Sequence, residues 1–441
     1  MLIPSWNGRA HLETCLAALA EQHDPGVPWD VWVLDNGSSD GTAEWLEREW
    51  RSRAQPRVHV VRSDRNLGFA AGVNRLVEAA ADAELVAFLN NDTRPRREWL
   101  GELVGPLAAA PPDVAAVSGC ILDWEGERLD FGRGVVTFDG HAFQLDYRRP
   151  LARARVPKAG EELPFACGGN LLVRRDRFLA AGGFDAAYFA YYEDVDLGWR
   201  LWASGQRVLA APAAVVHHRS GATSDLLGLY RRGFLFERNA FLTVHKNLDD
   251  ELWPRLMPVV MLTLLARGQH LLTHANPGGG LLAADPYAGD GSRHSAPSPV
   301  AVHASPAEPR RFGNLRRGDL AGAWRSVRSR LALALTAALH DEAHSASFGA
   351  QAPQLTDERT VAQLQALSSL LGNLDGAAER RASVQAARKV PDREILARFP
   401  LWVVPTYPGD DALFASPGFR SWLPADVPLV EASLAEVMEW G

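Results

Sequence analysis

The sequence predicts an α/β protein: a Rossmann-like, doubly wound and mostly parallel sheet, followed by a mainly helical C-terminal region. Two observations predict this fold class. Short apolar runs alternate with segments of helical periodicity early in the chain, and polar residues follow directly where several of these runs end. Strands that alternate with helices form a parallel sheet with helices on both faces.

The clearest strand covers residues 85–89, whose consecutive apolar side chains are typical of a strand buried on both faces. Further strands are predicted at residues 1–3, 31–34, 58–61 and 114–117. A helix from about Glu98 to Leu107 is predicted between the strands at 85–89 and 114–117. The opening strand is clipped: either the true start lies upstream, or the sheet lacks part of an interior strand whose backbone groups need partners.

The pattern changes after residue 128. Glycines and short alternating runs at 128–149 predict a hairpin excursion, and residues 170–175 predict a strand that leaves a glycine-rich bend. A short helix near Asp176 is expected to end at Gly182-Gly183, because glycine readily adopts the left-handed conformation of a helix stop. Two last strands are predicted at 208–210 and 214–218.

A chain of 441 residues predicts two or three domains. We expect an α/β domain at residues 1–224 and a helical extension at 225–274. Residues 275–312 are rich in Gly, Pro, Ser and Ala and predict a flexible linker. Residues 313–441 predict a mainly helical region, for which the sequence suggests no role.

Composition limits the function classes. A net charge of −7 gives no reason to expect nucleic acid as a partner. The three cysteines, Cys15, Cys120 and Cys167, match no zinc spacing, and their odd number favours a reducing cytoplasm. No signal peptide is visible, and the apolar stretch at 256–266 is too short to span a bilayer. Arginines beside apolar stripes at 226–272 are compatible with peripheral membrane contact, but also with ordinary core packing.

Polar residues collect where the predicted strands end, at Asp35, at Asn66 and at Asn90-Asn91-Asp92. Ligands of open α/β sheets bind at the carboxyl ends of the strands, so these side chains predict a pocket at one sheet edge. One carboxylate and two carboxamides there are suited to a divalent cation and a phosphate. The alternative is that Asp92 or Thr93 caps the helix starting near Arg96.

A run of aromatic residues at 188–192 precedes Glu193-Asp194-Val195-Asp196. Three carboxylates at a helix start interact favourably with the helix dipole, with Asp194 as N-cap and Asp196 in the first turn. Alternatively, the aromatic run forms a wall for a sugar, and a carboxylate beside it acts as general base. Both interpretations remain open on this stretch alone.

His217 and His218 end a predicted strand. A histidine there is able to complete a metal site with Asp92, because imidazole and carboxylate both bind divalent cations. A structural or exposed histidine pair is the other interpretation. No G-x-G-x-x-G sequence follows the first strand and no P-loop sequence is present, so neither of these nucleotide-binding motifs is expected.

Six stretches, taken in order, resemble the inverting family-2 glycosyltransferases of GT-A fold, particularly the bacterial rhamnosyltransferase-like members. They lie within residues 1–224, at 3–8, 33–42, 65–74, 89–93, 182–185 and 192–201. The resemblance implies a nucleotide-sugar pocket formed by polar and aromatic residues at the sheet edge. These residues are Pro4, Trp6, Asp35, Asn36, Asn66, Asn90, Asn91 and Asp92.

The resemblance also implies a role for each matching residue of the reaction centre. Asp92 and His218 would bind a divalent cation, Mn²⁺ or Mg²⁺, that bridges the donor diphosphate. Asp194 would be the catalytic base, and Glu193 would place it or bind the acceptor. The residues expected to bind the acceptor are Tyr191, Tyr192 and Trp199. Asn90 departs from the family pattern of two acids, which implies weaker metal binding or a contact with sugar hydroxyls.

The resemblance therefore implies a glycosyltransferase that moves a sugar, from dTDP-rhamnose or a UDP-sugar, to a glycan or lipid-linked acceptor with inversion. It also implies a role in cell-envelope polysaccharide synthesis, in the cytoplasm or at the inner membrane face. One alternative is a non-catalytic scaffold or carbohydrate-binding protein, which Asn90 and the clipped opening strand favour and the intact Glu193-Asp194 pair opposes. A sugar-phosphate nucleotidylyltransferase would need a glycine-rich basic loop that residues 6–9 do not supply.

Overall fold

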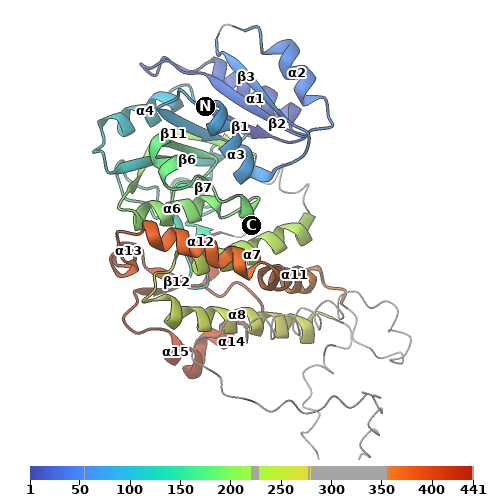
Figure 1. The fold of residues 1–441 in the computed structure, drawn as a ribbon, viewed down its shortest axis with the longest axis vertical. Coiled ribbons are helices and arrows are strands. Elements are labelled where there is room, and N and C mark those ends of the chain that lie inside the picture. The colour runs from blue at the N-terminus through green and yellow to red at the C-terminus, as the bar shows by residue number, and fades with distance from the viewer. Residues whose placement is uncertain (54, 220–227, 277–278, 280–354, 440–441) are drawn as a thin grey trace, which may run out of the picture.

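The computed structural model describes residues 1–53, 55–219, 228–276, 279 and 355–439. Figure 1 shows the sheet and its helices at one end of the molecule, with the C-terminal helices stacked below them. Most of the predicted linker, and the part of the C-terminal region before residue 355, lie outside the described residues.

The main sheet has the strand order β3-β2-β1-β4-β10-β6-β11-β5, and β7 pairs with β6. Its strands are β1 (Leu2–Ser5), β2 (Val31–Asn36), β3 (Val58–Ser63), β4 (Leu85–Leu89), β5 (Thr93–Pro95), β6 (Val114–Asp123), β7 (Leu129–Phe131), β10 (Asn170–Arg174) and β11 (Arg207–His218). Strands β1 to β4 are parallel, as are β6 and β11, whereas β10 is antiparallel to both of its neighbours. The mostly parallel sheet is as predicted.

Helices cover both faces of this sheet (Figure 1). They are α1 (Arg9–Ala20), α2 (Thr42–Glu49), α3 (Gly68–Ala79), α4 (Trp99–Ala109), α5 (Arg175–Ala180) and α6 (Glu193–Ala203), with a 3₁₀ turn, η1 (Ala186–Tyr188). Successive strand residues face opposite sides. Val33 and Leu89 accordingly belong to the core with α1 and α4, whereas Leu34 and Phe88 belong to the core with α3 and α5. The sheet is therefore doubly wound.

The opening strand β1 is short but interior. It pairs residue for residue with β2, from Leu2 opposite Trp32 to Ser5 opposite Asp35, and contacts β4 through Leu2 opposite Phe88. The described chain thus supplies this interior strand, and the sheet does not lose it.

The two predicted last strands are one strand, β11, whose ladder with β6 shifts between Ala210 and Val215. Asn170 stabilises this irregularity: its amide nitrogen donates to the carbonyls of Cys120 and Ala214, each at 3.0 Å. Opposite it, a Cβ on Gly119 would lie 2.3 Å from the Ala214 oxygen. A small residue is required at position 119. In β11 itself, Ala211, Pro212 and Ala213 lie at the shift, so the apolar pattern is interrupted although the strand continues.

The excursion after β6 contains β7 and the hairpin of β8 (Gly134–Val136) and β9 (Ala142–Gln144), as predicted. The described C-terminal region is mainly helical. Its elements are α7 (Gly228–Asn247), α8 (Trp253–His274), α11 (Glu358–Gly372), α12 (Leu374–Ala387), α13 (Asp392–Arg398), β12 (Leu401–Val403), α14 (Asp410–Ala415), α15 (Pro417–Trp422), β13 (Leu429–Glu431) and α16 (Leu434–Val437).

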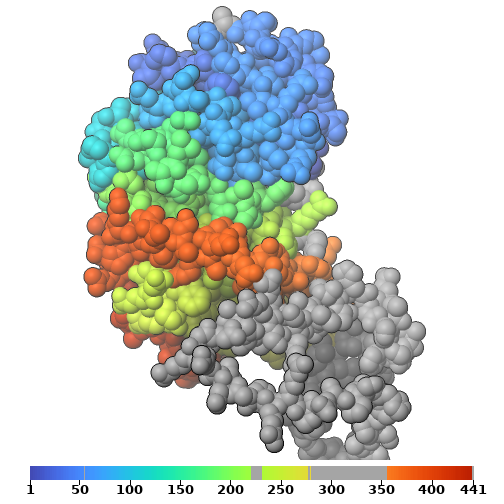
Figure 2. All heavy atoms as spheres, in the orientation of Figure 1, coloured from blue at the N-terminus to red at the C-terminus, as the bar shows by residue number. Residues whose placement is uncertain are grey.

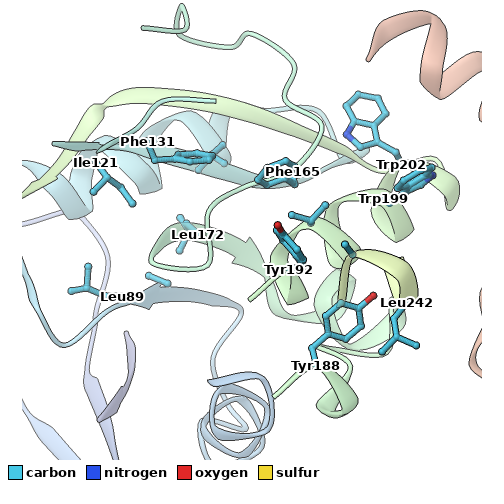
Figure 3. Close-up of a cluster of buried hydrophobic side chains, with 14 of the residues drawn as sticks. Leu89, Ile121, Phe131, Phe165, Leu172, Tyr188, Tyr192, Trp199, Trp202 and Leu242 are labelled. Atoms are coloured by element: carbon cyan, nitrogen blue, oxygen red, sulfur yellow. The ribbon is translucent and has the colours of Figure 1, made fainter. Parts of the chain in front are cut away.

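The C-terminal elements share a core with the α/β part. Figure 3 shows Phe165 between Phe131 of the sheet and the tryptophans of α6, and the same buried cluster continues from Ile3 in β1 to Phe419 in α15. In the space-filling view the orange C-terminal helices lie directly against the green atoms of the α/β part (Figure 2). The described C-terminal region therefore packs as part of one body with the sheet.

By length and composition, one helix of the described residues, α8, is able to cross a membrane. The core helix of a soluble protein has the same properties, and 44% of the most apolar window of α8 is buried inside the structure. Its Arg267 is also buried, between Asp139 and Asp410. Within the structure, α8 behaves as a packed core helix.

Candidate functional site

A cavity of about 950 Å³ opens where the parallel strands end. It brings together residues that are far apart in the sequence, from β1, the ends of β2 and β4, the start of α6 and the end of β11. The sequence-predicted residues that line it are Pro4, Trp6, Asn36, Asn66, Asn90, Asn91, Asp92, Tyr191, Tyr192, Glu193, Asp194 and His218.

Two predicted residues lie elsewhere. Asp35 is buried at the end of β2 and accepts a hydrogen bond from the Ser38 amide at 3.2 Å. Trp199 is on the face of α6 that packs against α13, and its indole donates to the buried Asp392 at 3.0 Å. Since its ring lines a separate cavity of about 330 Å³, the structure does not bring Trp199 to the predicted acceptor site.

Hydrogen bonds of the Asn36 side-chain amide shape one wall of the cavity. Asn36 donates to Asn66 Oδ1 and to the Gly68 carbonyl, both at 3.1 Å, and accepts from the Leu67 amide at 2.9 Å. Gly68 has φ of +82°, and a Cβ there would lie 2.4 Å from the Phe189 carbonyl oxygen. Asn36 therefore fixes the start of α3, which places Asn66 at the wall.

The turn after β4 directs Asp92 to the cavity. Asn91 donates to the Ser5 hydroxyl at 2.9 Å, and the Thr93 hydroxyl donates to the Asn90 carbonyl at 2.6 Å. The alternative that Asp92 or Thr93 caps α4 is wrong, because α4 begins at Trp99 and its N-cap residue is Glu98.

His218 lies between two carboxylates. Its Nδ1 is 2.7 Å from Asp130 Oδ2, and its Nε2 is 3.3 Å from Asp92 Oδ1. Burial alone lowers the pKa of His218, but the hydrogen bond with Asp130 and the close negative charges of Asp92 and Asp130 outweigh burial and raise the pKa to about 10. His217 is not in the cavity lining; its Nε2 is 3.5 Å from the Arg96 guanidinium nitrogen Nε. Sequence reasoning missed Asp130, which lies in a stretch predicted only as a hairpin.

Asp92 and His218 fit a divalent cation. Asp92 Oδ1 is buried and accepts no hydrogen bond from the described residues, although His218 Nε2 is only 3.3 Å away. Two ligands at right angles on an octahedral cation, each about 2.1 Å from it, are about 3.0 Å apart. The described residues contain no group of three His, Cys, Asp or Glu side chains arranged for a metal. Magnesium often binds through one or two protein carboxylates and substrate phosphates, so two ligands are sufficient.

A strained loop presents the acidic pair to the cavity. Phe189, Tyr191 and Tyr192 have φ values of +64°, +69° and +67°, a region that non-glycine residues seldom occupy. Asn239 of α7 stabilises this backbone, since its amide donates to the carbonyls of Tyr188, Ala190 and Tyr191 at 2.8–3.0 Å. Sequence reasoning also missed Asn239, because nothing in the helical pattern of α7 marks it.

The helix start differs from the predicted cap. Tyr192 is the N-cap residue of α6, so the interpretation of Asp194 as N-cap is wrong. Asp196 is structural, as its first-turn position suggested: it binds Arg200 and Lys246, each at 2.7 Å. Glu193 and Asp194 remain as the acids that line the cavity.

Asp194 and Glu193 have different surroundings. Asp194 accepts hydrogen bonds from the amides of Gly168 at 2.9 Å and Val195 at 2.8 Å, yet burial still raises its pKa. Glu193 is buried with Oε2 unbonded, and burial, then the charge of Asp194, raises its pKa well above the ordinary value. The pKa is raised more for Glu193 than for Asp194, so Asp194 is the acid of the pair that ionises first. Such a pair separates the roles of base and hydrogen-bond donor.

The C-terminal region completes the far side of the cavity. Phe236 of α7 packs against Tyr191 and Tyr192, with ring centroids 4.7 and 5.7 Å apart. The lining residues from beyond α7 are Thr406, Tyr407, Leu434, Met438 and Glu439. The sequence carries no motif for these residues, and their place in the site was not predicted.

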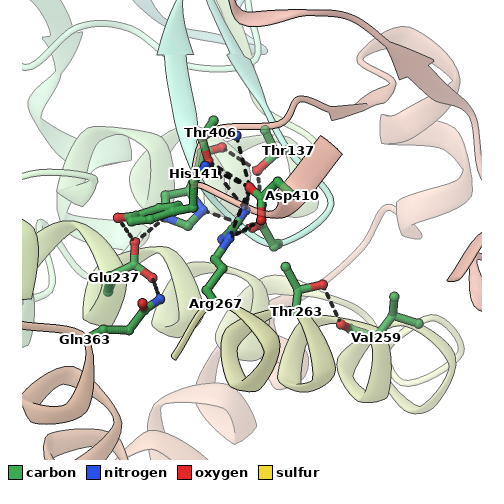
Figure 4. Close-up of polar contacts among 11 residues, drawn as sticks. Thr137, His141, Glu237, Val259, Thr263, Arg267, Gln363, Thr406 and Asp410 are labelled. Carbon is green, nitrogen blue, oxygen red and sulfur yellow. Dashed lines mark hydrogen bonds and ion pairs between the residues drawn. The ribbon is translucent and has the colours of Figure 1, made fainter. Parts of the chain in front are cut away.

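A buried ionic cluster supports this side (Figure 4). Arg267 binds Asp139 at 2.6 Å and Asp410 at 2.9 Å, and His141 lies 3.1 Å from Asp139 and 3.0 Å from Glu237. Burial lowers the pKa of His141, but the charges of Asp139 and Glu237 outweigh it and raise the pKa to about 10. The cluster joins the β8–β9 hairpin, α7, α8 and the C-terminal segment.

Comparisons with a family model and with individual proteins agree on one family. Residues 1–179 match "Glycosyl transferase family 2". Over 236 residues the chain is 32% identical to N-acetylglucosaminyl-diphospho-decaprenol L-rhamnosyltransferase of Mycobacterium tuberculosis, covering 48% of this chain and 73% of that protein. It is 31% identical over 205 residues to the O-antigen biosynthesis protein RfbC of Myxococcus xanthus, covering 44% of this chain and 15% of that protein.

Among solved structures, the mannosyltransferase PcManGT of Pyrobaculum calidifontis, in complex with GDP-Man and Mn²⁺, is similar with a TM-score of 0.44 and 19% identity. The similarity covers 85% of this chain and 86% of that one.

Proposed function

The chain belongs to glycosyl transferase family 2, and on this premise we propose that it transfers a sugar from a nucleotide-sugar donor to an acceptor hydroxyl with inversion. Membership confirms the family resemblance, and the doubly wound sheet agrees with the GT-A fold. The observation that carries the proposal is one cavity lined by both the Asp92–His218 pair and the Glu193–Asp194 pair.

The donor side of the proposal rests on the strand ends. Pro4, Trp6 and Asn66 would contact the nucleotide, while Asp92 and His218 would hold Mn²⁺ or Mg²⁺. The cation, when bound, would neutralise charge that develops on the leaving diphosphate. The first acid of the family motif is Asn90 here, an uncharged side chain that lines the cavity and is available to sugar hydroxyls.

The acceptor side rests on the acidic pair. Asp194 would remove the proton of the acceptor hydroxyl as its oxygen attacks the anomeric carbon. The bond from that carbon to the nucleoside diphosphate breaks in the same displacement, which inverts the configuration. Protonated Glu193 would donate a hydrogen bond to an acceptor oxygen, and Tyr191 and Tyr192 would contact the acceptor sugar.

The names of the relatives guide the choice of substrates. One relative is an L-rhamnosyltransferase whose named acceptor is linked through a diphosphate to decaprenol, and another acts in O-antigen biosynthesis. We therefore propose dTDP-rhamnose first and UDP-sugars second as donors. The proposed acceptor is a glycan or lipid-linked intermediate of the cell envelope, met in the cytoplasm or at the inner face of the membrane.

The test is nucleotide binding and turnover with a panel of dTDP-, UDP- and GDP-sugars, with and without Mn²⁺ or Mg²⁺. Asp92→Ala is expected to abolish metal-dependent nucleotide binding. Asp194→Asn is expected to keep binding but to lower the rate of donor turnover about 10²- to 10⁴-fold, because the general base is lost.

The matched control is His217→Ala, which changes the neighbouring histidine outside the cavity lining and is expected to leave binding and turnover unchanged. If no nucleotide-sugar binds the wild-type protein, the transferase proposal fails in favour of the scaffold alternative. If Asp194→Asn turns over donor at the wild-type rate, the assignment of the base fails.

A further inference from the structure

A β-bulge between β6 and β7 directs the buried carboxylate of Asp130 toward His218. In the ladder of β6 with β7, Ile121 pairs with Phe131 and Leu122 pairs with Leu129, so Asp130 is the extra residue between two register positions. A bulge of this kind changes the direction of one side chain and often lies beside an active site. Asp130 is 4% exposed and lines the cavity.

The histidine reaches the same point from the opposite side of β6. His218 is the last residue of β11, where it pairs with Asp123 of β6 and with Thr93 of β5. The pairing with Thr93 brings it beside Asp92, the preceding residue. The backbone therefore fixes His218 between β5, which brings Asp92, and the bulge of β7, which brings Asp130.

The two ring nitrogens face different partners. Nδ1 lies 2.7 Å from Asp130 Oδ2, the separation of a short charge-assisted hydrogen bond. Nε2 lies 3.3 Å from Asp92 Oδ1 without a hydrogen bond between them. A histidine whose Nδ1 proton is held by a carboxylate directs the Nε2 lone pair to a metal, and such carboxylates fix the ring and raise the basicity of the ligand.

We propose that Asp130 is the positioning residue of the metal site, holding His218 in the Nδ1–H tautomer so that Nε2 and Asp92 bind the divalent cation together. The inference rests on the proposed function, since that function supplies the cation. In this proposal Asp130 contacts the ring nitrogen that faces away from the cation and acts through the ring.

The test measures Mn²⁺ affinity of the full chain in saturating UDP or dTDP, by the electron paramagnetic resonance signal of free Mn²⁺. Asp130→Asn is expected to weaken Mn²⁺ binding about 10- to 100-fold, the usual effect of losing a carboxylate behind a metal-binding histidine. In the His218→Ala background the same change is expected to have no further effect, because Asp130 acts through the ring.

Asp123→Asn is the matched control. Asp123 pairs with His218 across the strands, but its carboxylate accepts hydrogen bonds from the amides of Glu127 and Arg128 in the β6–β7 turn. This variant makes the same change of charge close to the site, and Mn²⁺ affinity is expected to stay within twofold of wild type.

A measurement on the wild-type protein removes any dependence on how the variants fold. With ¹⁵N-labelled histidine, addition of Mg²⁺ and UDP is expected to shift Nε2 of His218 while Nδ1 keeps its proton. A shift of Nδ1 instead would overturn the proposal.

Each remaining outcome is decisive. Wild-type affinity in Asp130→Asn, or an equal loss with and without His218, would show that Asp130 does not act through the ring. If the wild-type protein binds nucleotide but no Mn²⁺, this inference and the metal part of the proposed function fail together. If Mn²⁺ binds and Asp130→Asn has no effect, this inference alone fails.

Discussion

Glu193 is a buried carboxyl group, and one of its oxygens has no hydrogen bond to any residue that the structure describes. Its pKa is raised well above the ordinary value by burial and then by the charge of Asp194. A carboxyl group whose pKa is higher in the folded state contributes its full stabilisation only at pH values below its ordinary pKa, which is about 4.3. It loses that contribution as the pH rises through the raised pKa.

We therefore expect Glu193→Gln to be more stable than wild type at pH 8, by about 1 kcal/mol or more, and similar to wild type near pH 4. The measurement is the unfolding free energy in urea across this range. Glu13→Gln, at an exposed residue of α1, serves as the control for an ordinary change of charge. A gap in stability that is constant with pH would contradict the protonated state of Glu193.

At the residue scale, the sequence predicted the site wherever a side chain directly follows a strand. Asn90-Asn91-Asp92 and His218 were found in this way, because strand ends meet at one edge whatever the details of packing. Asp130 and Asn239 were not found. The role of Asp130 depends on a bulge and that of Asn239 on a distant loop, and neither leaves a local pattern.

At the element scale, the position of α6 depends on a close approach that only glycine permits. A Cβ on Gly198 would lie 2.4 Å from Phe165 Cβ and 2.6 Å from the Pro164 carbonyl oxygen. The contacting atoms belong to the backbone or are fixed directly to it. The helix that begins with Glu193 and Asp194 is therefore positioned by contact with the segment before β10.

Gly198→Ala is expected to destabilise the protein by about 1–3 kcal/mol, because the helix or the segment must shift. Transfer activity should fall as well, since the shift separates Asp194 from the Gly168 amide. Gly268→Ala in α8, where a Cβ meets nothing within 4 Å, should instead stabilise by about 0.5–1 kcal/mol. Denaturant unfolding and donor turnover of both variants check this, and equal behaviour of the two would disprove the close contact.

The spacing of apolar residues predicted which segments are helices and which are strands, but not where each one begins and ends. The pattern at 208–218 predicted two strands because Ala211-Pro212-Ala213 interrupts it, whereas the Asn170 amide bonds to both strands at the interruption. Tertiary hydrogen bonds of this kind cannot be read from neighbouring residues. The antiparallel direction of β10 was likewise not predicted, since direction depends on the path of the preceding loop.

At the scale of the whole molecule, buried charges connect the two halves. Arg267 is 3% exposed and neutralises Asp139 from the hairpin and Asp410 from the C-terminal segment. Removing one partner of a buried ion pair leaves charge without compensation, which typically costs about 3–5 kcal/mol.

Arg267→Met is therefore expected to lower the unfolding free energy by about 3–5 kcal/mol and to expose residues 401–439 to proteolysis. Arg255→Met removes an exposed pair with Asp426 and should cause no comparable loss. Adding Asp410→Asn to Arg267→Met should restore part of the stability, because one uncompensated charge is removed. Urea unfolding and limited trypsin digestion measure both effects, and wild-type resistance of Arg267→Met would show that the cluster does not hold this segment.

The C-terminal half of the cavity was beyond prediction from the sequence. Its contacts join residues very distant in the chain, such as Arg149 with Ala435, and its lining residues follow no known motif. The hydrophobic pattern predicted helices there, but not which surface they cover.

This arrangement has a consequence for the timing of synthesis. A ribosome releases the strand ends that line the donor side hundreds of residues before Tyr407 and Met438, and domains generally fold as they emerge. A nascent chain can thus form the donor side of the cavity while the far side, which Tyr407 and Met438 line, is still incomplete. The wall of the cavity that Tyr407 and Met438 line is then added to strand ends that have already folded.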